Sequence, residues 1–386
     1  MADLSVVSSY DVKLTSDCVE WSAAQEHSVL ACASYQLDKT TRTRIGELRL
    51  YRFSNEGNQD GEHCPEKNLG TEHLGLIKSV DSAGIFDIKF SSLQENRARL
   101  LASATASGHC DIYPFSGSES IPGDPIKLNL LENEQDEAYC LSVDWNDRKN
   151  SQNALKVAVS LSNGYISVLE IRDGADAEVV NSFFAHEYPY LDAGAEAWIT
   201  SFDCWNPNVL YSGADDSKLK VWDLNAGIQK PVLVNSTSHS AGVCSMQTSV
   251  HEEHLLVTGS YDNCIRLWDK RNLRCPTNNP YDVGGGVWRL KFHPHAEKKN
   301  LLLAACMRSG FRIFDISSTF KSESNAISLV SCYNNGLDDG KWESLAYGVD
   351  WIIPDREKTS EDFVAGASFY DHTLRLFKCE ISSRGA

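Results

Sequence analysis

The chain alternates short apolar segments with polar residues, in a pattern that returns at a fixed spacing. In each clear copy, an apolar strand leads into a tight turn with Asp or Gly, and a strand of alternating apolar and polar residues follows. Trp222 and Trp268 lie 46 residues apart near the ends of two copies, and a further 46 residues reach Phe314. Four stretches show this hairpin: Ser212–Asp223 (SGADDSKLKVWD), Thr258–Asp269 (TGSYDNCIRLWD), Ala304–Asp315 (AACMRSGFRIFD) and Ala367–Phe377 (ASFYDHTLRLF). A repeat of this length predicts an array of small antiparallel sheets.

Counting the repeats gives seven units, each opened by a short strand that ends in or near an aromatic residue. Short, evenly spaced strands with WD dipeptides resemble the WD-repeat β-propeller, although the first three units lack that dipeptide. We therefore predict an all-β fold, a seven-bladed WD-repeat β-propeller that forms a single domain over residues 1–386. In this family an N-terminal strand, here residues 5–14, completes the last blade and closes the ring. The predicted units are 15–82, 83–135, 136–186, 187–238, 239–283, 284–333 and 334–386.

Composition restricts the classes of function. The 386 residues include 36 basic and 53 acidic side chains, which gives a formal net charge of −17. Nucleic-acid binding requires a basic surface, so this acidic excess argues against a nucleic-acid partner. No apolar run approaches the roughly 18 residues of a membrane-spanning helix, and the N-terminal segment does not have the pattern of a secretory signal. We expect a cytoplasmic protein that contacts neither nucleic acid nor membrane.

Cysteine and histidine spacing argues against a metal site. The twelve cysteines are scattered singly with no CxxC pair, which is typical of reduced thiols packed inside a protein. The segment His251–His254 reads HEEH, which differs from the HExxH spacing that places two ligands on one helix face. Gly284–Gly286 leads into a strand rather than a helix, so phosphate binding there is not expected. The sequence predicts no metal and no cofactor.

Some polar residues are expected to serve the scaffold. A well-formed WD unit contains a hydrogen-bonded network of a His before the first strand, a Ser or Thr in the second strand, an Asp in the turn and the Trp. The fourth unit supplies His186, Ser212, Asp216 and Trp222, and the fifth supplies His239, Thr258 or Ser260, Asp262 and Trp268. We favour this structural interpretation of these residues over a catalytic one.

Other polar and aromatic residues are not explained by the repeat and meet on one end of the predicted propeller. That end collects the turns between second and third strands and the loops that enter each first strand. Arg308 replaces the turn Asp in the sixth unit, and Ser309 and His372 come just after that position in their units. The remaining candidates on this rim are Glu196, Trp198, Asp215, Tyr261, Trp288 and Tyr370. Composition alone favours a general protein-binding surface here.

Longer stretches give a closer match than the generic repeat. These stretches are Leu14–Leu37, Ala185–Trp205 (AHEYPYLDAGAEAWITSFDCW), Tyr211–Asp223, Gly242–Asp262, Gly284–His295 (GGGVWRLKFHPH), Leu301–Phe311 (LLLAACMRSGF) and Ser368–His372. They resemble the WD-repeat family of diphthamide biosynthesis, the diphthine methyltransferase family, and the resemblance spans both ends and most of the middle of the chain.

The resemblance implies a carboxyl methylesterase that removes the methyl ester from methylated diphthine on elongation factor 2. The freed carboxylate can then be amidated to diphthamide. Elongation factor 2 is the implied partner, and other proteins of the diphthamide pathway are further candidates. The alternative is a non-catalytic WD-repeat scaffold or a substrate receptor of a ubiquitin ligase.

The residues on the rim are compatible with this chemistry. Diphthine carries a quaternary ammonium, which donates no hydrogen bonds and is held best by aromatic faces and nearby carboxylates. Trp198, Tyr261, Trp288 and Tyr370, with Glu196 and Asp215, can supply such a binding site.

Ester hydrolysis also requires a nucleophile or activated water, a proton acceptor and a donor to the developing oxyanion. We hypothesise that His372 or His239 is the base and that Arg308 stabilises the oxyanion. Ser309 is the candidate nucleophile, or it positions a water molecule. Cys306 is a weaker alternative because its place in an apolar strand indicates a buried, unreactive thiol.

Overall fold

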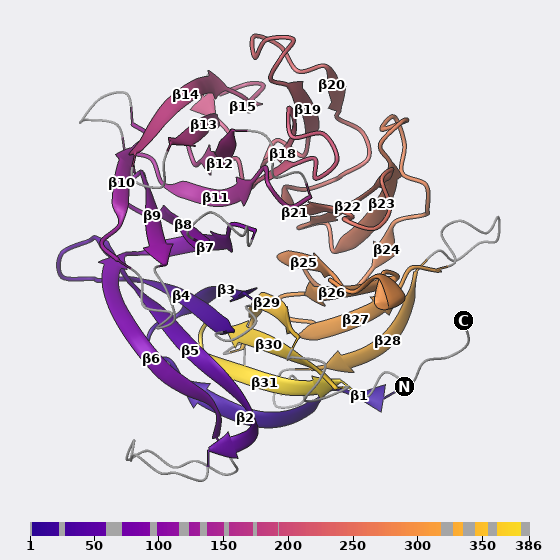
Figure 1. Ribbon diagram of the computed structural model, residues 1–386. Helices are drawn as coiled ribbons and strands as arrows, with labels where there is room; N and C mark the ends of the chain where they lie inside the picture. The colour runs from indigo at the N-terminus through magenta and orange to yellow at the C-terminus, as the bar shows by residue number, and fades with distance from the viewer. Residues whose placement is uncertain are drawn as a thin grey trace.

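The strands form a closed ring of sheets around a central axis. The computed structural model describes residues 2–22, 28–58, 72–92, 99–115, 123–131, 137–149, 154–172, 176–191, 193–317, 327–334, 344–353 and 361–379. Within these ranges the main strands build seven sheets, which confirms the predicted seven-bladed β-propeller (Figure 1). The described ranges contain no α-helix, and η2 (Ala296–Lys298) is a short turn of 3₁₀ helix. In particular, no described helix has the length and apolar character needed to cross a membrane.

Blades one to four follow in chain order. Blade one comprises β3 (Ser16–Ser22), β4 (Val29–Leu37), β5 (Arg44–Asn58) and β6 (Glu72–Ala83). Blade two comprises β7 (Ile85–Phe90), β8 (Arg99–Thr105), β9 (His109–Phe115) and β10 (Ile126–Asn129). Blade three comprises β11 (Cys140–Trp145), β12 (Leu155–Leu161), β13 (Tyr165–Arg172) and β14 (Asp176–Phe184). Blade four comprises β17 (Ile199–Phe202), β18 (Val209–Gly213), β19 (Leu219–Asp223) and β20 (Leu233–Asn235). The predicted boundary between the second and third units, at 135 and 136, lies outside the described residues.

The other three blades use the C-terminal part of the chain together with the N-terminal strands. Blade five comprises β21 (Val243–Thr248), β22 (Leu255–Ser260), β23 (Cys264–Asp269) and β24 (Tyr281–Asp282). Blade six comprises β25 (Arg289–Phe292), β26 (Leu301–Ala305), β27 (Phe311–Asp315) and β28 (Ser328–Tyr333). Blade seven comprises β29 (Ala346–Ile352), β30 (Asp362–Ser368), β31 (Thr373–Cys379) and β2 (Ser5–Asp11).

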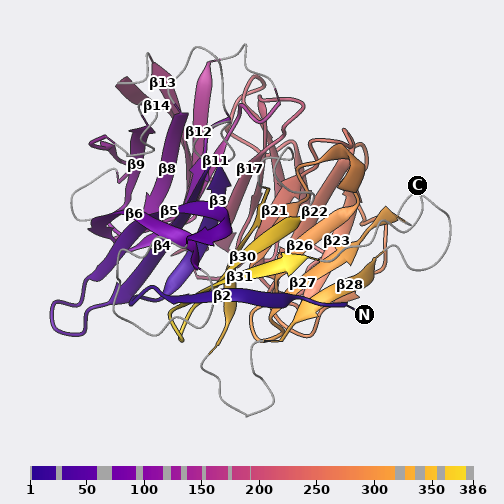
Figure 2. The ribbon, with the colours of Figure 1, turned by 60° about the horizontal axis from the view of Figure 1, so that its bottom comes forward.

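The N-terminal segment closes the ring as predicted. β2 pairs antiparallel with β31, and Figure 2 shows the two strands side by side. The sequence did not predict a second link: β1 (Ala2–Asp3) pairs in parallel with β28 of blade six. The first few residues therefore join two blades, and the outer edges of β31 and β28 are covered by backbone hydrogen bonds.

The apolar core lies between neighbouring blades. The first strand of each blade lies innermost and contacts the first strand of the next, from β3 and β7 round to β29 and β3. β8, β22 and β30 are buried along their whole length, because each blade packs against a neighbour on both faces. One cluster joins blade five, through Leu255 and Leu267, to blade six, through Phe292 and Phe314. These contacts between neighbouring blades fix the positions of the innermost strands relative to one another.

A hydrogen-bonded network holds blade four. His186 Nε2 lies 2.7 Å from Ser212 Oγ, and its Nδ1 lies 3.0 Å from Asp216 Oδ1. Trp222 Nε1 donates to Ser212 Oγ at 2.9 Å. His186 and Ser212 are fully buried, so the network satisfies groups that have no access to solvent. This is the scaffold network that the sequence predicts.

Blade five forms only part of that network. His239 Nε2 and Trp268 Nε1 both reach Thr258 Oγ1, at 3.0 and 2.9 Å, so Thr258 rather than Ser260 fills the strand position. Asp262 instead pairs with Arg266, whose Nη2 lies 2.7 Å from Asp262 Oδ2. The Nδ1 atom of His239 is left buried without a hydrogen bond.

The blade-four network generates a stability prediction. Ser212→Ala removes the oxygen that serves His186 and Trp222, and leaves buried polar groups without a partner. We expect the free energy of unfolding to fall by about 2–4 kcal/mol, measured by denaturant unfolding. Ser236→Ala is the control because Ser236 is exposed. Equal losses in the two variants would contradict the structural role of Ser212.

Candidate functional site

Four aromatic side chains from four blades cluster at one end of the propeller. Trp198 precedes β17, Tyr261 follows β22, Trp288 precedes β25 and Tyr347 lies in β29. The ring centroids of Trp198 and Trp288 are 5.6 Å apart, and Tyr261 lies 6.3 Å from Trp198 and 5.8 Å from Trp288. Tyr347 stacks on Trp288 at 4.9 Å. We call these four residues the aromatic cluster.

The aromatic contacts continue around the rest of the ring. Tyr347 contacts Phe369 at 4.7 Å, and Phe369 contacts Tyr35 of blade one at 5.1 Å. Tyr35 then contacts Phe86 of blade two at 4.5 Å, and Phe86 stacks on Tyr139, before blade three, at 6.0 Å. Every blade therefore contributes at least one aromatic residue to this end of the molecule. Such an end offers π faces to a cation that enters along the axis.

Two carboxylates lie beside the aromatic cluster. The Tyr188 hydroxyl is 2.6 Å from Glu196 Oε2 and 2.9 Å from Asp215 Oδ2, and Trp198 Nε1 donates to Asp215 Oδ1 at 3.2 Å. A Cβ atom on Gly242 would come within 2.5 Å of Asp215 Oδ1, so a larger residue there would displace this carboxylate. Burial and the two carboxylates raise the pKa of Tyr188, which keeps it a neutral donor. Glu196 and Asp215 are therefore held by hydrogen bonds as an acidic pair at the edge of the aromatic cluster.

Tyr188 lies on a hairpin that the sequence shows only as a long loop. β15 (Glu187–Tyr188) pairs with β16 (Ala193–Gly194) in a small two-stranded sheet. Between them, Tyr190 is 94% exposed and Leu191 is 68% exposed. The hairpin is anchored to the acidic pair at its base and presents apolar side chains to solvent near its tip.

A buried carboxyl from blade one, missed by the sequence reasoning, belongs to the same site. Asp17 lies at the start of β3 with no exposed surface, and neither of its carboxylate oxygens makes a hydrogen bond. The Nε atom of Arg289 and the Nε1 atom of Trp288 are also buried without a hydrogen bond. Arg289 Nη2 lies 3.8 Å from Asp17 Oδ2 and 3.3 Å from Asp87 Oδ1. Native proteins rarely leave this many neighbouring polar atoms unpaired.

The electrostatics of Asp17 connect it to the aromatic residues. Burial raises the pKa of Asp17 to about 7, because the opposing effect of Arg289 is only partial and the nearby Asp87 adds to the rise. Trp288 Nε1 is close enough to lower that pKa, although it makes no hydrogen bond. The phenol pKa values of Tyr35, Tyr261 and Tyr347 are raised first by burial and further by the negative charge of Asp17.

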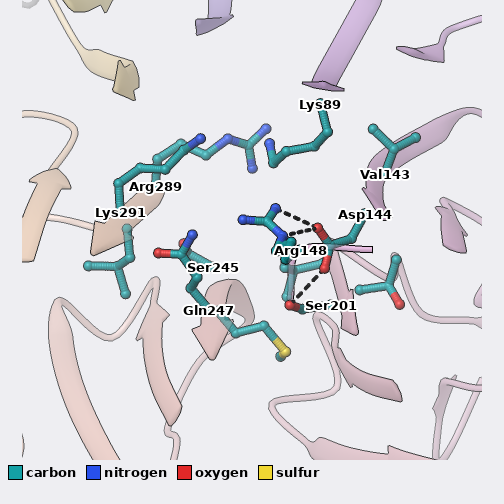
Figure 3. Close-up of a pocket in the computed structure, with 13 residues that line it drawn as sticks. Lys89, Val143, Asp144, Arg148, Ser201, Ser245, Gln247, Arg289 and Lys291 are labelled. Atoms are coloured by element: carbon teal, nitrogen blue, oxygen red, sulfur yellow. Dashed lines mark hydrogen bonds and ion pairs between the residues drawn. The ribbon is translucent and has the colours of Figure 1, made fainter. Parts of the chain in front are cut away.

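Farther along the axis, the buried charges are paired. Figure 3 shows Lys89, Arg148, Arg289 and Lys291 converging on a cavity of about 30 Å³. Arg148 Nη2 lies 2.6 Å from Asp144 Oδ1, and Lys89 Nζ lies 2.8 Å from Asp87 Oδ1. Lys291 bridges Glu20 of blade one and Asp350 of blade seven. These ion pairs hold inner strands together around the axis.

The structure brings together most of the predicted binding residues. Trp198, Tyr261 and Trp288 are in mutual contact, and Glu196 and Asp215 join them through Tyr188 and Trp198. Tyr370 contacts Phe369 at 4.9 Å and is 55% exposed, so it lies at the outer edge of the site.

The predicted catalytic residues of blades six and seven occupy turns at the same end. Ser309 is buried, and a Cβ atom on Gly284 or Gly285 would lie 3.1 Å from its Oγ. Arg308 is exposed on that turn. His372 is partly buried at a positive φ of 55°, and its carbonyl oxygen accepts a hydrogen bond from Val12 N. Ser309 thus lies against the triple glycine that precedes Trp288, rather than in the aromatic cluster.

Two other candidates, His239 and Cys306, are buried and do not suit a catalytic role. Burial lowers the pKa of His239 to about 3, and the positive charge of Arg266 adds to this effect, so the imidazole is neutral. Its Nε2 serves the blade-five scaffold, and we do not retain His239 as the base. Cys306 is fully buried, and burial raises the pKa of its thiol to about 12, so it is the unreactive thiol that the sequence indicates.

Comparison with known proteins adds family relationships to this geometry. Residues 185–223 and 230–269 match the WD domain, G-beta repeat family. The chain is 34% identical to diphthine methyltransferase of Homo sapiens over 88% of its length and 73% of that protein. It is 29% identical to the diphthine methyltransferase homolog of Dictyostelium discoideum over 94% of this chain and 96% of that protein. A chain in a crystal structure of the mitotic checkpoint complex superposes with a TM-score of 0.64 over 98% of this chain and 93% of that chain. Its identity of 14% indicates a shared fold alone.

The pKa of Asp17 generates a prediction about stability. Because this pKa is raised to about 7, the folded state holds the proton more tightly than the unfolded chain does. The stabilisation from Asp17 is therefore complete below about pH 4 and is lost as the pH rises through about 7. Asn does not ionise. We expect Asp17→Asn to exceed the wild type in free energy of unfolding by a few kcal/mol at about pH 8, and by much less at about pH 4.

A carboxyl with the opposite shift provides the control for this stability measurement. Hydrogen bonds from His293 and Lys298 outweigh the effect of burial and lower the pKa of Asp362 to about 2. Asp362→Asn is therefore expected to lose stability at about pH 8. Denaturant unfolding at the two pH values tests both variants, and a pH-independent difference for Asp17→Asn would contradict the assignment.

Proposed function

The chain belongs to the diphthine methyltransferase family, and from this membership we propose that it acts in diphthamide biosynthesis as a carboxyl methylesterase. Its substrate is methylated diphthine on elongation factor 2. Water replaces the methoxy group, and the products are the free carboxylate and methanol. The carboxylate is then available for amidation to diphthamide.

The observation that carries this proposal is the aromatic cluster with the acidic pair beside it. A quaternary ammonium has no hydrogen to donate, so it is recognised by π faces and by negative charge. Trp198, Tyr261 and Trp288 supply the faces, and Glu196 and Asp215 supply the charge. The tyrosine and tryptophan donors fix the carboxylate of Asp215 before any ligand binds, so little ordering is needed on binding.

The net charge fits a partner that presents a cationic side chain. A formal charge of −17 favours the approach of a positively charged surface and increases the association rate at low salt. We place this encounter in the cytoplasm, with elongation factor 2 presenting its modified side chain to the aromatic end of the propeller.

The direct test is incubation of the purified protein with methylated elongation factor 2. We expect methanol release and a mass loss of one methylene group from the modified side chain, both followed by mass spectrometry. A non-catalytic scaffold or a ubiquitin-ligase receptor would bind partners and release no methanol. Stable binding without a mass change would therefore decide for the alternative function.

Recognition of the ammonium generates a second prediction. Glycine betaine methyl ester and methyl 3,3-dimethylbutanoate have the same shape, but only the first carries a charge. We expect the wild type to favour the charged ester, and Trp198→Ala to raise its KM by roughly 10-fold because a cation–π contact is lost. Trp205→Ala is the control, since Trp205 follows β17 at its other end and donates to the Ser249 carbonyl. Equal KM values for the two esters on the wild type would contradict ammonium recognition.

The exposed tip of the β15–β16 hairpin generates a third prediction. Tyr190 and Leu191 lie near the acidic pair but make no part of it, so we propose that they contact the protein that carries the modified side chain. We expect Tyr190→Ala with Leu191→Ser to raise KM for methylated elongation factor 2 about 10-fold and to leave KM for the small charged ester unchanged. A parallel rise for both substrates would place these residues in the ester site instead.

A further inference from the structure

The buried polar atoms beneath the aromatic cluster have no role in binding the ammonium. They are the two oxygens of Asp17, Nε of Arg289 and Nε1 of Trp288, and all four are buried without a hydrogen bond. They come from blade one and blade six, and Arg289 Nη2 lies 3.8 Å from Asp17 Oδ2. These two acceptors and two donors match the hydrogen-bonding capacity of a water molecule and of an ester carbonyl.

We propose that Asp17 is the proton acceptor that activates water for ester hydrolysis, and that Arg289 donates a hydrogen bond to the developing oxyanion. This inference rests on the proposed esterase function and names catalytic residues that the sequence reasoning missed. The ammonium of the substrate lies against the aromatic cluster, and the neighbouring ester points down toward Asp17.

The reaction balances with water as the only co-substrate. Asp17 takes a proton from water while the water oxygen bonds to the ester carbonyl carbon, and the carbonyl π electrons move to its oxygen. The N–H of Arg289 stabilises that oxyanion. When the tetrahedral intermediate collapses, the bond to the methoxy oxygen breaks, and the leaving group takes the proton from Asp17 as methanol. The carboxylic acid product loses its proton to solvent.

The environment of Asp17 suits a base that works near neutral pH. Burial holds its pKa at about 7, in the range where a carboxylate is both available and a competent proton acceptor. The charge compensation by Arg289 is only partial, and a fully paired carboxylate would be a weaker base. The charged and titratable groups that act on or respond to this carboxyl include Cys18, Tyr35, Asp87, Lys89, Tyr261, Arg289 and Tyr347.

The other candidate bases are less well placed. His239 is neutral and bonded to Thr258 within the blade-five scaffold. His372, the other candidate base, is partly buried in the turn between β30 and β31. Ser309, the candidate nucleophile, packs against Gly284 and Gly285. Asp17 is the carboxyl whose charge acts on Tyr261 and Tyr347 of the aromatic cluster and whose own oxygens remain unpaired.

The test compares methanol release by the wild type, Asp17→Asn and Asp111→Asn, with folding checked by circular dichroism. Asp111 is the matched control because it is a buried aspartate of blade two whose pKa is also raised by burial. We expect Asp17→Asn to lower kcat at least 100-fold with KM changed less than threefold, and Asp111→Asn to keep kcat. In the wild type, kcat/KM is expected to rise with pH through about 7, and Asp17→Asn is expected to lose this dependence.

The outcomes separate this inference from the proposed function. If the wild type releases methanol and Asp17→Asn keeps its rate and its pH profile, the assignment of Asp17 is overturned while the esterase function stands. If the wild type releases no methanol from methylated elongation factor 2, both are overturned.

A single-turnover experiment in ¹⁸O water tests the role without any variant. A general base predicts that the label enters the product carboxylate in the first turnover. Label in the Asp17 peptide, with unlabelled product, would show that Asp17 attacks the ester itself and would overturn the role as a base. Because this measurement uses the wild type, it remains decisive if Asp17→Asn fails to fold.

Discussion

The antiparallel pairing of β2 with β31 is the contact on which the other features depend. A row of small sheets has two open edges and no fixed curvature until its ends are joined. By supplying the outer strand of blade seven, the N-terminal segment makes blades one and seven neighbours. The cluster that includes Val19 and Leu30 of blade one and Phe363 and Leu376 of blade seven is the apolar result of that closure. The innermost strands of the seven blades then surround a common axis.

Closure of the ring also determines which charged side chains are buried near the axis. Side chains of the inner strands that face the axis cannot be solvated as they would be on an outer surface, so they must pair with charges from other blades. Lys291, Glu20 and Asp350 do this across three blades. Asp17 lies 3.8 Å from Arg289 but makes no hydrogen bond to it, and Arg289 also pairs with Asp87 and donates a hydrogen bond to the Phe86 carbonyl oxygen. The closed ring therefore pairs Lys291 with Glu20 and Asp350, but it leaves the charge of Asp17 only partly compensated.

The sequence predicts the architecture well because the repeat is a local pattern. The hairpins around Trp222 and Trp268, the closing N-terminal strand and the network of His186 are all visible as spacing and residue type. The contacts among Trp198, Tyr261 and Trp288 follow because the turns between second and third strands meet the loops that enter the first strands at one end of the propeller. Asp262 shows the limit of this approach, because Arg266, four residues later, takes the carboxylate that the repeat assigns to His239.

Asp17 could not be found in the same way. It lies in a strand whose sequence, SDCVEWS, resembles any buried inner strand, and its importance comes from Arg289 and Trp288, more than 270 positions away. Only the closed ring shows that these residues are neighbours. The signal available in the sequence was weak: an aspartate among small and apolar residues at the start of a first strand, within a stretch that matches the family.

The bond from the Trp21 amide to Asp350 spans 329 positions and has a consequence for how the protein is made. Asp17 belongs to blade one, which is synthesised first, and Tyr347 of the aromatic cluster belongs to blade seven, which is synthesised last. A nascent or truncated chain can build individual sheets, but it has no assembled site. Asp17 and the aromatic cluster therefore come together only after blade seven has been synthesised.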